Sequence, residues 1–248
     1  MRLVRQIVNA VLMVFVAASS LASAAPSCRL PNTIPATQPG KPGDVRNVPI
    51  GGYLLTFSWS PEVCFNAQRN AGRNAANSAY AAPVDTTIQC GKINHFAFVL
   101  HGLWPEGQDK DWPQYCRPVA PVSAATVRGE LCRTPSVSLI EHEWEKHGSC
   151  GWKTPEAYFA QSSKLMDALR LPDLSGLTRG QVNASAIRTA FLAANPGLPH
   201  DAIGVAANKS GWFEEVRLCL DTAFKYHTCP SYSFGTTDAE RVKVARLR

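Results

Sequence analysis

The sequence lacks several patterns that mark common classes of protein. Its eight cysteines include no C-x-x-C pair, which argues against a thioredoxin-like redox site and against a zinc ribbon. After residue 24, no apolar stretch is long enough to cross a bilayer. No internal repeat or linker divides the chain. These absences favour one globular domain, and 248 residues are enough to give it a well-buried core.

Residues 1–24 have the pattern of a secretory signal peptide. They combine a basic start, an apolar stretch over 7–18 and a small-residue cleavage site at 22–24. The apolar stretch is too short and too interrupted for a good membrane span, so a retained anchor is the less favoured alternative. We therefore expect residues 25–248 to form a single domain that is secreted or periplasmic, with no membrane contact after the signal is removed.

All eight cysteines lie in the part that would be exported, and their number is even. Four disulfides formed in an oxidising compartment are the simple expectation. One bridge, between Cys64 and Cys90, would close the Asn- and Ala-rich segment 66–87. We expect that segment to be a surface excursion without a core pattern.

The net charge of the chain is weakly informative. It is +6, and loss of Arg2 and Arg5 with the signal peptide would leave +4. A mildly basic protein suits a polyanionic partner such as nucleic acid, although many secreted proteins carry a similar charge.

The apolar patterns predict an α+β fold with a central antiparallel sheet packed with helices. Strands are predicted at 53–60, 96–100 and 212–220, with 224–234 as a partner of the last. Helices are predicted over 138–148, from Thr154 to about 169, and from Thr178 to about 194. The charged tail over 238–248 fits either a short helix or an irregular end.

The stretch that begins at Ser138 is the densest in ionisable side chains. Ser138 followed by Glu141 fits a capping box, so a helix is expected to begin there, and Gly148 is suited to end it. Ile140 and Trp144 are four residues apart and can anchor the back of this helix in the core.

Four ionisable residues of this helix would face one cleft. At about 100° per residue, His142 and Lys146 share one stripe, and Glu143 and His147 share a neighbouring one. A zinc site of the H-E-x-x-H type needs two histidines four residues apart, whereas these two are five apart. In a regular helix they cannot readily share one ion, so we expect no metal.

A second candidate is His101, which follows the predicted strand at 96–100. A side chain at the end of a buried strand can be held rigidly at a cleft. Gly102 permits close approach of the backbone, and Trp104 with Pro105 forms a stiff aromatic wall. Alone, this histidine is as compatible with a structural role as with a functional one.

Two segments carry a specific resemblance. Residues 98–105 match the pattern F-x-x-H-G-L-W-P, and residues 142–150 match H-E-W-x-K-H-G-[ST]-C. Both matches are complete and in the expected order, and flanking features extend the similarity over about residues 50–230. The chain therefore resembles the ribonuclease T(2) family of secreted endoribonucleases, in particular its secreted or periplasmic bacterial branch.

The resemblance implies an α+β catalytic domain over residues 25–248 that acts on RNA as a monomer, without a cofactor or metal. It implies disulfides Cys116–Cys150 and Cys219–Cys229, with Cys64–Cys90 as a third, and it leaves Cys28 and Cys132 for the fourth.

The chemistry of RNA cleavage suits these residues. The 2′-hydroxyl adjoins the scissile phosphorus, so much of the cost of orienting the nucleophile is prepaid. The reaction needs a base, an acid and positive charge near the phosphate. We assign His101 and His147 as the acid–base pair, with the order open, and Lys146 to the developing negative charge.

The remaining site residues have supporting roles by the same resemblance. His142 would bind phosphate, and Glu143 would orient His147 or help polarise the phosphate. Trp104 is a candidate stacking surface for a base, the alternative being a buried core tryptophan. Glu106 lies where some relatives carry an acidic residue that helps read the base. Because stacking tolerates every base, we expect broad specificity.

The sequence thus predicts a metal-independent endoribonuclease that cleaves single-stranded RNA by attack of the 2′-hydroxyl and leaves 2′,3′-cyclic phosphate ends. One rival is a non-catalytic secreted binding protein on the same scaffold, and another is a metal-dependent phosphodiesterase. The histidines outside the motifs are expected to be structural or on the surface: His95, His200 and His227.

Overall fold

A computed structural model describes residues 28–34, 43–70 and 86–247. The predicted signal peptide and most of the predicted surface excursion lie outside these residues. No helix in the described ranges is long and apolar enough to span a membrane. The elements are β1 (Ile50–Trp59), α1 (Ser60–Asn70), α2 (Thr86–Cys90), β2 (Phe98–Gly107), α3 (Ala124–Glu130), α4 (Val137–Glu143), the π-helix η2 (Trp144–Gly148), α5 (Ser149–Gly151), α6 (Pro155–Asp167), η3 (Ser175–Leu177), β3 (Gln181–Asn183), α7 (Ala184–Ala194), η4 (His200–Ala202), β4 (Ile203–Ala207), β5 (Phe213–Leu220), α8 (Ser231–Phe234) and β6 (Arg241–Lys243).

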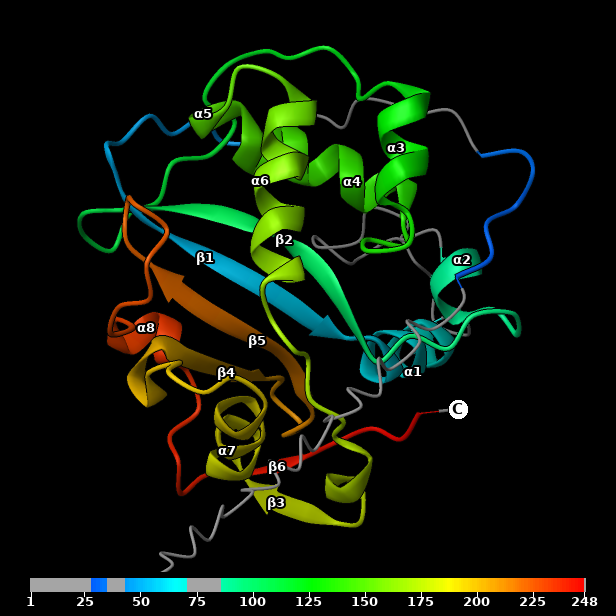
Figure 1. Cartoon of the computed structure of the whole chain (residues 1–248), viewed down its shortest axis with the longest axis vertical. Helices are drawn as coiled ribbons and strands as arrows, with labels where there is room; N and C mark the ends of the chain where they lie inside the picture. Colours follow the sequence, from blue (N-terminus) through cyan, green and yellow to red (C-terminus); the bar gives the residue numbers. More distant parts are fainter. Residues whose placement is uncertain (1–27, 35–42, 71–85, 248) are drawn as a thin grey trace, which may run out of the picture.

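A four-stranded sheet in the order β2-β1-β5-β4 runs through the centre of the molecule, and all its neighbouring strands are antiparallel. The helices α4 and α6 pack against β2, whereas α7 and α8 pack at the β4 end of the sheet (Figure 1). A smaller sheet joins β3 to β6. The predicted α+β class, with an antiparallel sheet covered by helices, is confirmed.

The predicted strands are found, but their extents differ. The strand predicted at 96–100 runs instead over Phe98–Gly107, so His101 lies inside β2 rather than at its end. The extension is explained by β1, which begins at Ile50 and provides a partner for the whole of β2.

The second partner of β5 was predicted wrongly. Residues 224–234 form turns and α8, with only an isolated bridge between Leu220 and Tyr226. The partner is β4, a short strand of small and branched residues that carries too little pattern to be recognised.

Two other local predictions were wrong. The helix expected to begin at Thr178 begins at Ala184, because Gln181–Asn183 pairs with Arg241–Lys243 as a strand instead. The tail is therefore neither helical nor irregular at this point, and Trp59 Nε1 donates a hydrogen bond to the carbonyl oxygen of Ala245. Residues 66–70, the first part of the segment expected to be a surface excursion, continue α1.

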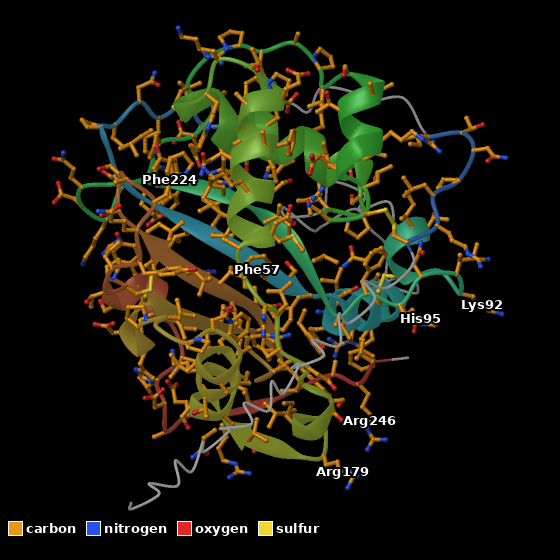
Figure 2. All side chains as sticks on the ribbon, viewed as in Figure 1. Phe57, Lys92, His95, Arg179, Phe224 and Arg246 are labelled. Carbon is orange, nitrogen blue, oxygen red and sulfur yellow. A yellow bond between two sulfur atoms is a disulfide. The ribbon has the colours of Figure 1, made fainter. Side chains whose placement is uncertain are left out.

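One apolar core fills the space between the sheet and its helices. Phe57 and Trp59 are fully buried in β1, and Phe191 is fully buried in α7. Phe57 lies in the middle of the molecule, whereas Arg179 and Arg246 lie at its rim (Figure 2). The predicted cap and helix after Thr154 are also confirmed, since Thr154 Oγ1 accepts a hydrogen bond from the backbone of Ala157.

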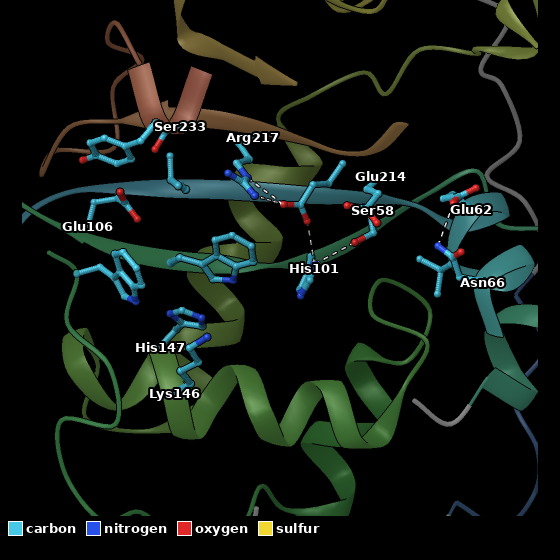
Figure 3. A pocket seen from close by; sticks show the side chains of 16 residues that line it. Ser58, Glu62, Asn66, His101, Glu106, Lys146, His147, Glu214, Arg217 and Ser233 are labelled. Atoms are coloured by element: carbon cyan, nitrogen blue, oxygen red, sulfur yellow. Dashed lines mark hydrogen bonds and ion pairs between the residues drawn. The ribbon is translucent and has the colours of Figure 1, made fainter. Parts of the chain in front are cut away.

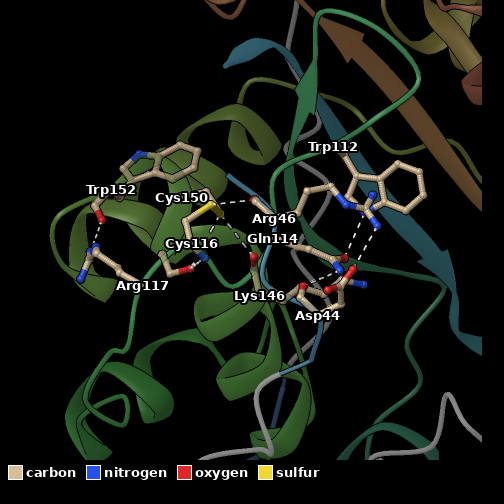
Figure 4. Close-up of a disulfide and its surroundings, with 10 residues drawn as sticks. Asp44, Arg46, Trp112, Gln114, Cys116, Arg117, Lys146, Cys150 and Trp152 are labelled. Atoms are coloured by element: carbon tan, nitrogen blue, oxygen red, sulfur yellow. Dashed lines mark hydrogen bonds and ion pairs between the residues drawn. A yellow bond between two sulfur atoms is a disulfide. The ribbon is translucent and has the colours of Figure 1, made fainter. Parts of the chain in front are cut away.

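All four predicted disulfides are present: Cys28–Cys132, Cys64–Cys90, Cys116–Cys150 and Cys219–Cys229. The bridge Cys116–Cys150 joins the loop after β2 to the helical segment that carries the second motif (Figure 4). It thereby ties the second motif segment to the loop that follows the first.

Candidate active site

One cleft of about 590 Å³ collects residues from both motifs (Figure 3). The strands β1, β2 and β5 form one wall, and η2 forms the other. The lining residues are Leu54, Ser58, Glu62, Val63, Asn66, His101, Trp104, Glu106, Trp112, Lys146, His147, Glu214, Glu215, Arg217, Tyr232 and Ser233. Both predicted acid–base histidines are therefore open to the same cavity.

His101 is placed by an irregularity in the sheet. In the pairing of β1 with β2, Thr56 faces Gly102 and Phe57 faces Leu100, so His101 is an extra residue with no partner opposite. A bulge of this kind bends the strand and re-aims a side chain, and bulges are frequent beside active sites. The ring of His101 is 28% exposed.

The neighbours of His101 are mostly acidic. Its Nδ1 lies 3.0 Å from Ser58 Oγ and 3.3 Å from Glu215 Oε2, and its Nε2 lies 3.6 Å from Glu143 Oε1. Burial alone would lower the pKa of His101. The hydrogen bond to Glu215 and the charges of Glu143 and Glu215 outweigh burial, so the pKa is raised.

The helix that carries the second motif begins and ends differently from the prediction. Its cap is Ser136, whose hydroxyl accepts from the backbone of Leu139, and not Ser138. Glu141 cannot complete a capping box because its carboxylate accepts hydrogen bonds from the backbone of Val122. The helical segment also continues past Gly148 to Gly151.

Gly148 has a packing role. Its backbone is helical, and a Cβ at this position would lie 2.4 Å from the ring of Trp144 and 2.9 Å from that of Tyr158. The glycine therefore lets two buried aromatic rings close over the helix. Trp144 and Ile140 are buried as predicted.

The segment that carries Lys146 and His147 is a π-helix. The backbone N–H of Ser149 donates to the carbonyl oxygen of Trp144, five residues earlier. This extra residue changes the angular order of side chains that a regular helix would give, and such π-turns are frequent at functional sites. The predicted stripes of a regular α-helix are therefore wrong in this segment.

His147 lies in an environment opposite to that of His101. It is 4% exposed, its ring stacks on Trp104 at a centroid distance of 5.3 Å, and its Nδ1 has no hydrogen-bond partner among the described residues. Burial lowers the pKa of His147 well below its ordinary value, and the neighbouring basic groups of Lys146, His142 and His101 lower it further. The ring is therefore neutral near pH 7.

Lys146 lines the cleft, but His142 does not. The ring of His142 meets Tyr115 edge to face at 6.3 Å. Burial lowers its pKa to about 4, and the charges of Lys146 and His101 contribute. A neutral imidazole can donate one hydrogen bond to a phosphate but adds no positive charge, so of these two residues only Lys146 brings a positive charge to the cavity.

Glu143 contacts His101 rather than His147, which corrects the predicted contact. Its Oε2 accepts a hydrogen bond of 2.7 Å from Trp104 Nε1 and lies 3.5 Å from the hydroxyl of Tyr158. Burial raises the pKa of Glu143 to about 7, against the lowering effects of His101 and Trp104. This carboxyl group therefore orients the strand-borne histidine.

Gly102 makes that contact possible. A Cβ at this position would lie 1.9 Å from Glu143 Oε2. Since no side chain fits there, the glycine of the first motif provides the space for the carboxylate of the second. The sequence prediction of a close backbone approach at Gly102 is confirmed.

Trp104 is held on several sides. Its ring meets His101 edge to face at 5.0 Å, stacks on His147, and lies 5.8 Å from Arg217 Cζ. It is a cleft-lining ring and not a fully buried core residue. The indole thus spaces the two histidines apart and also presents an edge to the cavity.

Glu106 lies at the end of the cleft opposite Glu62 and Asn66 (Figure 3), and Trp112 and Tyr232 line the same cleft. Burial raises the pKa of Glu106 to about 7, although Arg217 and the hydrogen bond from Tyr232 lower it. Trp112 is 40% exposed, and its Nε1 donates to Gln114 (Figure 4). The exposed ring of Trp112 can stack on a base, and the carboxyl group of Glu106 can hydrogen-bond the edge of that base.

Sequence reasoning missed several residues of the cleft, above all Ser58, Glu215 and Arg217. Glu215 and Arg217 stand two residues apart in β5, where Glu214 is the third charged residue, so they lie on the same face of the sheet. Two opposite charges on the buried face of a core strand are unusual, and that signal could have pointed to them.

The described residues contain no cluster of three or more His, Cys, Asp or Glu side chains that could hold a metal ion. The histidines outside the motifs do not line the cleft: His95 and His227 are exposed, and His200 pairs with Asp238 at 3.1 Å.

Comparisons with known proteins find a matching family and several relatives. The family model described as "Ribonuclease T2 family" matches residues 50–229. A probable ribonuclease of Haemophilus influenzae is 32% identical over 136 residues, which cover 53% of this chain and 47% of that protein. A ribonuclease of Aeromonas hydrophila is 33% identical over 115 residues, which cover 46% and 43%. The chain thus spans less than half the length of these two curated relatives.

Solved structures share the fold. The RNase-related protein from Calystegia sepium has a TM-score of 0.59 and 20% sequence identity, covering 80% of this chain and 98% of that chain. RNase NT, solved in complex with 5′-AMP, has a TM-score of 0.51 and 19% identity, covering 81% and 100%. At these identities, the likeness concerns the fold alone.

Proposed function

The chain belongs to the ribonuclease T2 family, and from this membership and the geometry of the cleft we propose that it is an endoribonuclease that needs no metal. It cleaves single-stranded RNA by attack of the 2′-hydroxyl and leaves 2′,3′-cyclic phosphate ends. One observation carries the proposal: His101 and His147 line one cavity, and their pKa values are displaced in opposite directions.

The displacements support one order of the two proton transfers. Neutral His147 accepts the proton of the 2′-hydroxyl, and the 2′-oxygen then attacks the adjacent phosphorus. Protonated His101 donates its proton to the 5′-oxygen of the leaving nucleoside as the P–O bond breaks. A free 5′-hydroxyl and a cyclic phosphate result, and hydrolysis of the cyclic phosphate reverses both roles.

The phosphate gains negative charge during this step, and Lys146 lies where it can stabilise that charge. Neutral His142 adds a hydrogen bond to a phosphate oxygen at most. Glu143 holds His101 through its contact at Nε2 and is itself fixed by Trp104. These contacts keep the acid in place before substrate binds.

The base that precedes the scissile phosphate occupies the end of the cleft formed by Trp104, Glu106 and Trp112. Stacking on an indole tolerates every base, which supports broad specificity. Glu106, with a pKa of about 7, can either donate or accept a hydrogen bond there. Its charge state therefore sets which base edge is preferred at a given pH.

The proposal extends to the whole chain. Residues 1–24 act as a signal peptide, and residues 25–248 form one monomeric domain that is secreted or periplasmic. Four disulfides support an oxidising compartment, because they would not persist in the cytosol. N-terminal sequencing of the exported protein, together with its mass in solution, tests cleavage and oligomeric state.

The test of activity is incubation of the purified protein with a single-stranded RNA in EDTA. We expect cleavage with 2′,3′-cyclic phosphate ends and no cleavage of a DNA strand of the same sequence, because DNA has no 2′-hydroxyl. Activity that EDTA abolishes would favour a metal-dependent phosphodiesterase. Binding of RNA without cleavage would favour the non-catalytic binding protein.

A further inference from the structure

Glu215 belongs to neither motif, yet it contacts His101 directly. Its carboxylate is 11% exposed, and its Oε2 lies 3.3 Å from His101 Nδ1. In the pairing of β1 with β5, Ser58 and Glu215 are direct partners, and both face the bulged histidine of β2 (Figure 3). Three neighbouring strands therefore converge on one imidazole nitrogen.

We propose that Glu215 is the positioning residue of His101, holding a proton on Nδ1 and stabilising the imidazolium that donates a proton from Nε2. The inference rests on the proposed function, because it concerns the acid of that reaction. An ionised carboxylate can only accept a hydrogen bond, so Glu215 favours the tautomer with the hydrogen on Nδ1, and the hydroxyl of Ser58 can accept from the same N–H group. The nitrogen that exchanges a proton with substrate is then Nε2, which lies 3.6 Å from Glu143 Oε1 in the unbound protein.

Arg217 keeps the carboxylate in this orientation. Its Nε and one terminal nitrogen donate to Glu215 Oε1 at 2.9 and 2.6 Å, which leaves Oε2 for His101. Two N–H groups of the guanidinium therefore hold one oxygen of the carboxylate and leave the other directed at the imidazole. Burial would raise the pKa of Glu215, but the bonds and charges of His101 and Arg217 outweigh burial and keep the carboxyl group ionised.

Arg217 also connects the acid to the base-binding end of the cleft. Its guanidinium lies 5.8 Å from the ring of Trp104 and lowers the pKa of Glu106. The same side chain therefore faces the proposed base pocket and fixes the partner of the acid.

Other charged groups face His101 and must be separated from Glu215 in a test. Glu143 raises the pKa of His101 from the side of α4, whereas Lys146 lowers it from η2. Ser58 offers a neutral partner at the same nitrogen. The variant Glu215→Gln removes one charge while keeping an oxygen that can accept from Nδ1, so it isolates the charge.

The experiment is an NMR titration of ¹⁵N-histidine in the full chain, with pH–rate profiles on a dinucleotide substrate. In Glu215→Gln we expect the pKa of His101 to fall by about one unit. The alkaline limb of the rate profile should move down by the same amount. Above this limb kcat should fall about tenfold with an unchanged KM, and Glu215→Asp should restore part of the loss.

The matched control is Glu130→Gln, which removes a partly buried carboxylate that does not line the cleft. It should leave the titration of His101 unchanged. The proposal is overturned if His101 titrates in Glu215→Gln as in the wild type, or if kcat falls equally at every pH.

The wild-type spectrum gives a test that does not depend on whether the variant folds. Neutral His101 should be the Nδ1–H tautomer, and an Nε2–H tautomer overturns the proposal. The titration needs no RNA. If the chain cleaves no RNA, the proposed activity is refuted, and the titration still shows whether Glu215 controls the pKa of His101.

Discussion

The strand side and the helix side of the cleft hold the same residue type in opposite environments. On the strand side, His101 lies between the carboxylates of Glu215 and Glu143, which raise its pKa. On the helix side, His147 is buried against Trp104 beside the cation of Lys146, and its pKa is lowered. The difference teaches that neighbours, and not residue type, separate an acid from a base.

The two sides also share a backbone device. His101 is the extra residue of a β-bulge, and His147 lies in a π-turn whose closing hydrogen bond spans five residues. Each is a one-residue insertion into a regular element, and each re-aims side chains towards the cleft. Regular elements would have presented these rings at other angles.

Removal of either histidine should produce the largest effect. His101→Ala and His147→Ala should each lower kcat on RNA by about 10²–10⁴-fold, because each removes one proton transfer. The two variants should then differ on a ribonucleoside 3′-aryl phosphate, whose leaving group needs no proton. There, His101→Ala should recover much of the loss and His147→Ala should not.

His95→Ala is the matched control, since that side chain is exposed and outside the cleft. Circular dichroism should show all three variants folded. Equal recovery of both cleft variants on the activated substrate would mean that the acid and base are wrongly assigned.

Removal of the cation on the helix side should have the next effect. Lys146→Met should lower kcat by about 10²-fold, as expected for loss of one group that stabilises transition-state charge. Because the charge of Lys146 lowers the pKa of His147, the acidic limb of the rate profile should move to higher pH. Lys153→Met, outside the cleft, should change neither quantity.

The wild-type pH profile reports both sides at once. The proposed reaction needs neutral His147 and protonated His101. Below the lowered pKa of His147, the rate should fall about tenfold per pH unit, and above the raised pKa of His101 it should fall equally. An ordinary histidine has a pKa of about 6.5, and the pKa values of His147 and His101 lie below and above it. The rate should therefore have a broad plateau that includes pH 6.5. A narrow peak would contradict the opposite displacements.

The smallest expected effect comes from the contact between the two sides. Gly102→Ala places a Cβ against Glu143 Oε2, so the carboxylate must move. Overpacking of this kind should lower the free energy of unfolding by about 1–3 kcal/mol. The pKa of His101 should also fall as Glu143 moves away. Denaturant unfolding and the histidine titration measure the two.

Gly129→Ala is the matched control for that substitution. It lies in α3, where an added Cβ meets nothing within 4 Å. The alanine should leave stability unchanged or raise it by about 0.5–1 kcal/mol. If Gly102→Ala behaves in the same way, the close contact with Glu143 is unimportant.

Residue patterns within short stretches of the chain were enough to predict much of this structure. The two motif segments, the cap at Thr154, the antiparallel α+β class and the four disulfides all followed from residue patterns or from the resemblance they carry. Capping and strand alternation depend on neighbours within a few residues, so they can be read from the sequence. Two predicted helix starts were wrong because of distant contacts. After Thr178, residues 181–183 pair with β6 as a strand, and after Ser138 the carboxylate of Glu141 accepts from the backbone of Val122 instead of capping the helix.

Only the tertiary structure decided the chemistry of the site. The bulge at His101 depends on the register of β1 and β2, and the partner of Glu143 depends on how α4 packs on that bulge. Glu215 lies in β5, far along the chain from both motif segments, and belongs to neither of them. The pKa of each histidine is set by burial and by charges that meet only after folding, which is why the sequence named both rings but left their order open.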